Sequence, residues 1–125
     1  MYNLPKSARL RTNGEFRRVY AGGLRYHGQF VTLFVMPNGL ATHRFGVTAS
    51  RKAIGPAHCR NRAKRLLRES FRLNLAALET ASVKCDWVFN AKRSLLETKV
   101  HSPLAELERI IQRVAREQQA KSNTL

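Results

Sequence analysis

The residues with the clearest chemical potential in this chain are basic ones between positions 58 and 72, in the run HCRNRAKRLLRESFR. Arginine dominates the run, and Glu69 is its only acid. Planar guanidinium groups donate paired hydrogen bonds to phosphate oxygens, so arginine is well suited to phosphate recognition. The run therefore predicts binding to a polyanion.

The helical period divides this run into two faces. One face holds small and apolar side chains that suit docking on a sheet: Cys59, Ala63, Leu66, Leu67, Ser70 and Phe71. The other face is cationic and holds Arg60, Asn61, Lys64, Arg65, Arg68 and Arg72, with Arg62 on its flank. Ion pairs with Glu69 relieve little of the repulsion, because each contributes only about 0.2–0.5 kcal/mol.

An ordinary charge run forms a solvated face, which is the simplest alternative here. Solvated helices usually mix both signs, whereas this face carries one. The whole chain of 125 residues has the same imbalance, with 23 Lys and Arg against 8 Asp and Glu, a net charge of +15 and a pI near 11.3. Arg44, Arg51 and Lys52 add basic charge just before the run. A nucleic-acid backbone is the expected partner, and binding should weaken as salt rises.

The sequence before the basic helix favours RNA over DNA. A DNA-binding helix-turn-helix places another helix directly before the recognition helix. Here strand-like sequence and the Gly55-Pro56 connector come first instead.

No set of residues predicts catalytic machinery in the protein itself. The histidines and acids are scattered, whereas a two-metal nuclease needs several acidic ligands at one point. We predict no metal site in the protein. Cys59 and Cys85 form no metal-binding or disulfide pattern, so we expect reduced, buried apolar residues of a cytoplasmic protein. No run approaches the roughly 18 apolar residues of a membrane span.

The first half of the chain predicts one short helix and two strands. The helix is capped at Thr12 or Asn13 and ends at the glycine pair 22–23. Residues 30–36, FVTLFVM, form a first strand, because β-branched and aromatic residues dominate them. Residues 45–50 form a second strand, which we expect to run antiparallel to the first.

The second half predicts a long helix, a strand and a last helix. Residues 53–56 are a connector with room for a short extended piece. The basic run lies in a helix from about residue 56 or 57 to residue 78, and residues 86–91 form a strand. Ser102-Pro103 begins the last helix, and we expect its tail to fray from about residue 118.

The element order α-β-β-(β)-α-β-α predicts an α/β (α+β) two-layer sandwich, in which helices pack on a small mixed sheet. We expect residues 1–125 to form a single domain with an ordered core over about residues 8–117. The strands on either side of the basic helix need a crossover connection if they are parallel. Spacing alone leaves the strand order and the hand of the crossover open.

The chain resembles the bacterial ribonuclease P protein component in a motif that runs from GVTASRK at 46–52, through Gly55, to RNRAKRLLRE at 60–69. The Arg-Asn-Arg core, followed by Lys-Arg and Arg-Glu, is highly specific. The likeness extends to residues 13–20, 30–34 and 86–92, and covers about residues 8–116 in all. Asn90 is a departure, because the family usually carries an apolar residue there.

This resemblance implies the ribosomal protein S5 domain 2-like fold, with a left-handed β-α-β crossover. Most β-α-β crossovers in proteins are right-handed. It implies a protein subunit of ribonuclease P, the endoribonuclease that removes the 5′ leader of precursor tRNA. The catalytic centre would lie in the RNA subunit, acting with Mg²⁺. The implied partners are that catalytic RNA and precursor tRNA, with no membrane and no required protein partner.

The resemblance also implies two RNA-binding surfaces. The Arg-Asn-Arg helix would meet the catalytic RNA through Arg60, Asn61, Arg62, Lys64, Arg65 and Arg68, with Arg51 and Lys52 beside them. A cleft between the first helix and the sheet would take the single-stranded leader on Phe16, Tyr20, Phe30 and Phe34. The candidates for a basic rim are Arg9, Arg11, Arg17 and Arg18. For each aromatic the alternative is core packing, and for each rim arginine it is solvated surface.

Three other functions remain as alternatives. The first is a structural RNA-binding protein of ribosomal type without a role in cleavage, which a test of leader-length dependence would separate. The second is a protein-only nuclease, which the scattered acids do not support. The third is a helix on a membrane surface, but the apolar face here is better used against a sheet.

Overall fold

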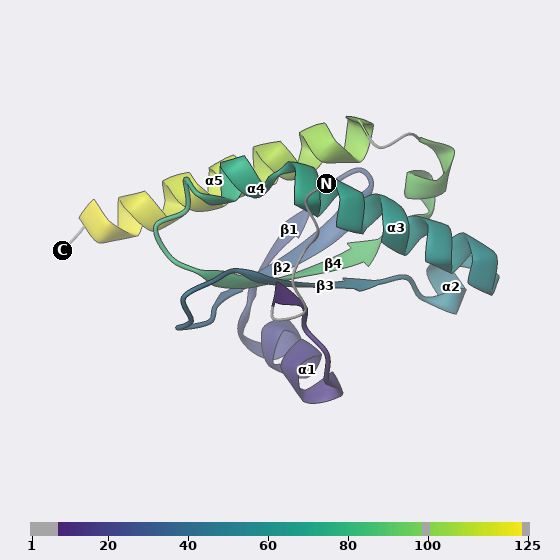
Figure 1. The fold of residues 1–125 in the computed structure, drawn as a ribbon, viewed down its shortest axis with the longest axis horizontal. Coiled ribbons are helices and arrows are strands. Elements are labelled where there is room, and N and C mark those ends of the chain that lie inside the picture. Colours follow the sequence, from purple (N-terminus) through teal and green to yellow (C-terminus); the bar gives the residue numbers. More distant parts are fainter. Residues whose placement is uncertain (1–7, 99–100, 124–125) are drawn as a thin grey trace.

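The computed structural model describes residues 8–98 and 101–123, which form a four-stranded sheet with helices on both faces. In Figure 1, α3, α4 and α5 cover one face of the sheet, and α1 lies against the other. The strand order is β1-β2-β4-β3. The arrangement confirms the predicted α+β class, with helices packed on a small mixed sheet.

The sheet is mixed because of its third strand in spatial order. β4 (Cys85–Ala91) pairs antiparallel with β2 (Val31–Pro37) and parallel with β3 (Arg44–Thr48). β2 and β3 therefore run in opposite directions, as predicted, but β4 lies between them. β1 (Leu24–His27) pairs antiparallel with β2 and was not predicted, since four residues are too few to show a period.

A helical crossover joins β3 to β4, as parallel neighbours require. It begins with α2 (Arg51–Ile54), a single helical turn. The short extended piece that we allowed in the connector at residues 53–56 is not found there, so that expectation was wrong. Gly55 then turns the chain with a φ of 105°, in the left-handed region that favours glycine. α3 (Ala57–Leu73) follows, and the hand of this crossover stays a prediction.

The helix predicted to continue to residue 78 breaks at Asn74. The side-chain amide of Asn74 donates to the carbonyl oxygens of Ser70, at 3.0 Å, and Leu104, at 3.1 Å. α3 therefore ends before Asn74, and α4 (Leu75–Leu78) is a separate turn. The contact with Leu104 joins segments far apart in the sequence, so no local pattern predicts this break.

The chain ends in α5 (His101–Asn123), which begins next to the predicted Ser102-Pro103 signal. α5 continues past residue 118, so the predicted fraying there was wrong. A short 3-10 helix, η2 (Arg93–Glu97), precedes it and was not predicted. None of the helices in the described ranges has the length and apolar character that a membrane crossing requires.

α1 (Asn13–Gly22) begins with a capping box, which confirms the predicted start. The hydroxyl of Thr12 accepts from the backbone N–H of Glu15 at 3.2 Å, and the Glu15 carboxylate accepts from the N–H groups of Thr12 and Arg11. This exchange satisfies N–H groups that have no partner within the helix. Gly23 caps the other end, where a Cβ would lie 2.6 Å from the carbonyl oxygen of Val19.

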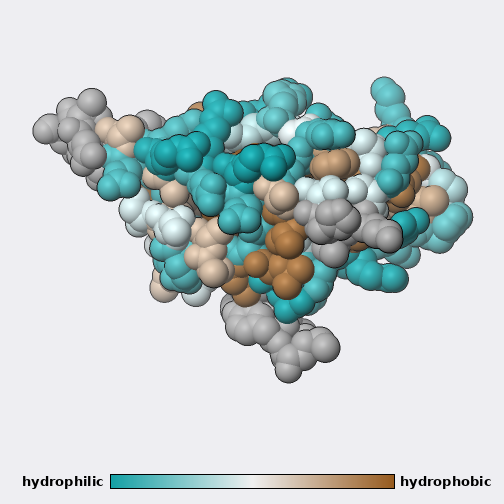
Figure 2. Space-filling view, turned by 90° about the horizontal axis from the view of Figure 1, so that it is seen from above, coloured by the Kyte–Doolittle hydropathy of each residue, from teal (hydrophilic) through white to brown (hydrophobic). Residues whose placement is uncertain are grey.

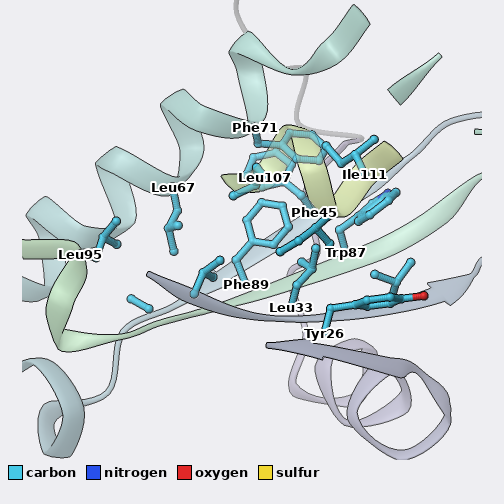
Figure 3. Close-up of a cluster of buried hydrophobic side chains, with 14 of the residues drawn as sticks. Tyr26, Leu33, Phe45, Leu67, Phe71, Trp87, Phe89, Leu95, Leu107 and Ile111 are labelled. Atoms are coloured by element: carbon cyan, nitrogen blue, oxygen red, sulfur yellow. The ribbon is translucent and has the colours of Figure 1, made fainter. Parts of the chain in front are cut away.

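The main core lies between the sheet and the helices α3 and α5. Successive residues of a strand point to opposite faces, so alternate positions of each strand reach this core. Figure 3 shows Leu33, Phe45 and Phe89 of the sheet packed with Phe71 of α3 and Ile111 of α5. The rings of Phe45 and Phe71 stack with centroids 4.6 Å apart. This packing fixes the apolar face of α3 against the sheet.

Candidate nucleic-acid interface

The first candidate surface is the cationic face of α3. Ala63, Leu67 and Phe71 are buried in the core, as the helical period predicted. The motif residues face outward: Asn61, Arg62, Arg65 and Arg68 are exposed, and Arg60 and Lys64 are half-buried. Figure 2 shows hydrophilic side chains over most of the face that α3 and α5 form. The structure thus gathers all six motif residues on one surface.

The charge of this surface is not neutralised within the described residues. Glu69, the acid of the run, pairs with Arg72 rather than with a motif arginine. The hydrogen bond from Arg72 holds the pKa of the Glu69 carboxyl below its usual value. Among the described side chains, ion pairs to carboxylates are made by Arg44, Arg72 and Arg113, all outside the motif. The motif cations therefore remain available to an external anion.

Arg51 and Lys52 extend the same surface from α2, where both are exposed. The hydroxyl of Ser50 caps this turn by accepting from the backbone N–H of Ala53 at 3.0 Å. α2 contacts α3, so the basic pair lies beside the motif helix.

The second candidate surface is a cleft between α1 and the sheet, with a volume of about 510 Å³. It is lined by Asn13, Phe16, Arg17, Tyr20 and Thr48. Tyr20 meets Phe34 of β2 edge to face, with ring centroids 4.9 Å apart. Tyr20 is exposed, and Phe16 and Phe34 are half-buried. The structure brings these three predicted aromatics together and leaves part of each accessible.

Phe16 fits over β3 because position 46 has no side chain. A Cβ at Gly46 would lie 2.5 Å from Cζ of Phe16 and 3.2 Å from Cβ of Leu10. Gly46 therefore lets α1 approach the sheet closely. A small buried cluster lies beneath α1 and consists of Leu10, Val19 and Val88, with Phe16, Phe34 and Met36 packed against it.

Phe30 does not join the other aromatics. It packs against the main core, not against the small cluster beneath α1. The chain bends at Phe30 before β2 begins, and the carboxylate of Glu106 accepts from its backbone N–H at 2.9 Å. The bend interrupts the alternation of strand faces that grouped Phe30 with Phe34. The expected place of Phe30 in the cleft is therefore corrected.

The four candidate rim arginines are all exposed, and they are Arg9, Arg11, Arg17 and Arg18. Of these, Arg17 lines the cleft. Arg9 forms a backbone bridge to Phe45, which ties the N-terminal segment to the edge strand β3. The sequence missed a further cation on β1, Arg25, whose guanidinium carbon lies 5.7 Å from the centroid of the Phe34 ring.

A row of polar side chains crosses the sheet beside the aromatics. His27, Thr32, Asn90 and Thr48 are direct neighbours on the four strands and share the face that α1 covers in part. Oδ1 of Asn90 accepts from the hydroxyl of Tyr20 at 2.8 Å and from that of Thr48 at 2.6 Å. We predicted no role for Asn90 from the sequence, although a polar residue in an apolar strand was a usable signal.

Arg44 holds α1 against the sheet through two carboxylates. Its guanidinium donates to both oxygens of buried Asp86, at 2.9 and 2.7 Å, and to Glu15 at 2.8 Å. The hydrogen bond to Asp86 raises the pKa of Arg44. Hydrogen bonds from the backbone N–H groups of Arg11 and Thr12, helped by the charge of Arg44, lower the pKa of Glu15. These contacts fix one wall of the cleft.

Other carboxylates also serve as structural acceptors. Glu106 accepts from the turn before β2, and Glu117 accepts from the hydroxyl of Tyr26 at 2.6 Å and from Arg113 at 3.0 Å. Across residues 8–98 and 101–123, no group of three or more His, Cys, Asp or Glu side chains could hold a metal ion. The converging carboxylates of a two-metal nuclease are not found in this part of the chain.

Both cysteines are free thiols. Cys85 is buried, as expected, and burial raises the pKa of its thiol to about 11. Cys59 is only half-buried, on the core side of α3. A thiol with a raised pKa is a poor nucleophile, because the thiolate is the reactive form.

The two surfaces approach each other at the end of β3. Thr48 lines the cleft, and Arg51 begins α2 three residues later, a backbone distance of at most about 10 Å. A nucleic-acid strand leaving the cleft at Thr48 would therefore come within reach of the basic pair on α2.

Comparisons with known proteins place these features in a family. A family model described as Ribonuclease P matches residues 4–115. The chain is 37% identical over 108 residues to the ribonuclease P protein component of Caldanaerobacter subterraneus subsp. tengcongensis, which covers 86% of this chain and 90% of that protein. It is 47% identical over 79 residues to the same component of Methylococcus capsulatus, which covers 63% of this chain and 62% of that protein.

Solved structures show the same fold. The RNase P protein from Thermotoga maritima matches with a TM-score of 0.72 and 26% identity, covering 84% of this chain and 96% of that one. The Staphylococcus aureus RNase P protein matches with a TM-score of 0.70 and 23% identity, covering 85% and 94%.

Proposed function

The chain belongs to the ribonuclease P protein family, and from this premise we propose that it is the protein subunit of a bacterial ribonuclease P. In that enzyme it assists the endonucleolytic removal of the 5′ leader from precursor tRNA in the cytoplasm. One observation carries the proposal: a single small chain presents both an exposed cationic helix and a separate, partly open aromatic cleft.

The hydrolysis belongs to the catalytic RNA, which acts with Mg²⁺ that the RNA binds. The carboxylates of the protein support a non-catalytic role, because Glu15 and Asp86 pair with Arg44, and Glu69 pairs with Arg72. Acids committed to arginines in this way are poor candidates for metal ligands. The protein contributes binding and orientation.

The cationic face of α3 binds the catalytic RNA. Apart from Arg72, which pairs with Glu69, its arginines and lysine carry no carboxylate partner among the described residues, so phosphate oxygens complete their hydrogen bonds. Arg51 and Lys52 widen this surface from α2. Each phosphate contact releases counterions, so the affinity falls as the salt concentration rises.

The cleft beneath α1 binds the single-stranded leader. The partly exposed faces of Phe16, Tyr20 and Phe34 offer stacking platforms, which contribute about 1–3 kcal/mol per base with little dependence on sequence. Arg17 on α1 and Arg25 on β1 lie at the cleft and beside Phe34, where they can meet the leader phosphates.

A structural RNA-binding protein without a role in cleavage is the competing function. Such a protein would use the basic helix, but it would have no need of an accessible aromatic cleft. The dependence of binding on leader length separates the two functions, because only the proposed subunit contacts the leader.

The test measures the affinity of the reconstituted holoenzyme for precursor tRNAs with no leader, a short leader and a long leader. We expect affinity to rise with leader length until the cleft is filled and then to stay constant. Phe34→Leu keeps apolar bulk but removes the aromatic face, so it should weaken leader-dependent binding by about 1 kcal/mol or more.

Phe30→Leu is the matched control, because the same change falls on an aromatic side chain that packs with the main core. It should leave the leader-length dependence unchanged. An affinity that does not depend on leader length in the unmodified protein would favour the structural RNA-binding protein.

A further inference from the structure

Glu69 is the one acid in the basic run on α3, so it lies close to the side chains proposed to bind RNA. The neighbours of a residue on the same helix surface are three and four positions away. Arg65 precedes Glu69 by four residues and Arg72 follows it by three, so either arginine is within reach of its carboxylate. A pair with Arg65 would take a motif cation away from the RNA-binding surface.

The structure pairs Glu69 with Arg72. Nε of Arg72 donates to Oε2 of Glu69 at 3.1 Å, and Nη2 of Arg72 donates to Oε1. The guanidinium group thus uses two donors on the two carboxylate oxygens, which fixes the geometry better than a single contact does. Among the described side chains, no ion pair joins Glu69 to Arg65, and the side chain of Arg65 is exposed.

The direction of the helix favours the pair with Arg72. An acid that precedes its basic partner along a helix forms a better pair than an acid that follows it. Glu69 precedes Arg72 but follows Arg65. The hydrogen bond from Arg72 also lowers the pKa of the Glu69 carboxyl, so this group stays charged at neutral pH. Without Arg72, a negative charge would be left beside Arg65.

We propose that Arg72 is a positioning residue of the RNA-binding surface, which holds the carboxylate of Glu69 so that Arg65 stays free for a phosphate of the catalytic RNA. In this role Arg72 contacts Glu69 and not the RNA. When Arg72 is replaced, Glu69 pairs with Arg65 and repels the nearby RNA phosphates. The inference rests on the proposed binding of the catalytic RNA to α3.

The test measures the affinity of this chain for a bacterial ribonuclease P RNA over a range of salt concentrations. Arg72→Gln should weaken binding about two- to fivefold, a size typical of one partly exposed ion pair. It should also reduce the magnitude of the slope of log affinity against log salt concentration by about 1, because Arg65 loses its phosphate contact.

The double change Glu69→Gln with Arg72→Gln is the decisive variant. It removes the acid that Arg72 holds, and its net charge equals that of the unmodified chain. Both the affinity and the salt slope should therefore return to the values of the unmodified protein. Glu69→Gln alone should not weaken binding, because no carboxylate is then left to compete for Arg65.

Arg113→Gln is the matched control for net charge. Arg113 pairs with Glu117 on α5, with 3.0 Å between Nε and Oε1, so it belongs to the same kind of pair one helical turn apart. The change removes the same charge as Arg72→Gln and should change binding and the salt slope little. An equal loss of affinity in both variants would assign the effect to net charge and overturn the proposal.

Two other results would also overturn the role of Arg72. If the double variant binds as weakly as Arg72→Gln, Arg72 contacts the RNA directly. If Arg72→Gln binds as tightly as the unmodified protein, Glu69 does not compete for Arg65. An unmodified chain that does not bind the RNA at all would instead contradict the proposed function on which the inference rests.

Discussion

At the scale of single residues, His43 is a half-buried acceptor beside Trp87 of β4. Its Nδ1 accepts from the backbone N–H of Cys85 and from the indole N–H of Trp87, both at 3.0 Å. Burial lowers the pKa of His43, and the nearby charge of Lys84 adds to the effect, although Glu79 opposes it. The folded protein therefore holds His43 neutral, because a protonated ring could not accept these bonds.

This burial predicts a loss of stability in mild acid. The unfolded chain takes up the proton at the ordinary histidine pKa of about 6.5, whereas the folded chain resists it. The stability that neutral His43 contributes to the folded protein is fully present above that pKa, and it is lost as the pH falls below it. The free energy of unfolding in urea should therefore be lower at about pH 5.5 than at about pH 7.5.

His43→Asn is the matched variant, because Oδ1 of asparagine can accept in place of Nδ1 but does not titrate. The difference in unfolding free energy between the two pH values should shrink in this variant. An equal pH dependence in both proteins would show that His43 does not cause it.

Arg65 tests the cationic face of α3. Arg65→Ala should weaken binding to the catalytic RNA. It should also reduce the magnitude of the slope of log affinity against log salt concentration by about 1, the change expected from the loss of one phosphate contact. Arg116→Ala removes the same charge from an exposed position in the C-terminal half of α5 and should change the slope little. Equal effects from both variants would mean that net charge, not the motif face, determines binding.

Residue-level prediction succeeded where a local period or motif governed the side chain. The division of α3 into a buried and a cationic face followed from the helical period, and Phe16, Tyr20 and Phe34 do meet. Phe30 was misplaced because Glu106, a distant residue, holds a bend at that point. The hydrogen-bond partners of Asn90 could not be predicted either, because Tyr20 of α1 and Thr48 of β3 are far from Asn90 of β4 in the sequence.

At the scale of elements, the attachment of α1 to the sheet depends on Arg44. Arg44→Leu leaves the carboxylate of Asp86, which is 2% exposed, with Asn38 as its remaining side-chain partner. Breaking a buried ion pair from one side costs about 3–5 kcal/mol. We expect urea denaturation to show a destabilisation near the lower end of that range, because Arg44 itself is partly exposed.

Two further variants separate the roles of the two carboxylates. The double change Arg44→Leu with Asp86→Leu should recover part of the lost stability, because it removes the unpaired buried charge. Glu15→Gln preserves the capping box and loses only a partly exposed pair, so it should cost less than about 1 kcal/mol. If Glu15→Gln costs as much as Arg44→Leu, the pair with Asp86 is not the dominant anchor.

Elements with strong local signals were predictable, and those fixed by distant contacts were not. Thr12 and Glu15 defined the start of α1, and the apolar run at residues 30–36 defined β2. The short edge strand β1 depends on its pairing with β2. The break between α3 and α4 depends on the bond from Asn74 to Leu104 of α5.

At the scale of the whole molecule, the sheet separates two surfaces with different chemistry. The cationic helix α3 lies on one face and α1 on the other (Figure 1). Residues of α1 and Thr48 of β3 line the cleft. The α+β class followed from the order of elements along the chain. The strand order did not, because placing β4 between β2 and β3 requires pairings between distant segments.

The most direct test of the central claim is the cleavage of a precursor tRNA at low Mg²⁺ by a bacterial ribonuclease P RNA, with and without this protein. Our account predicts that the protein raises kcat/KM for a substrate with a leader that fills the cleft, and raises it less for a substrate whose leader is too short. A cleavage rate that is the same with and without the protein, under conditions where the two are shown to bind, would contradict the account.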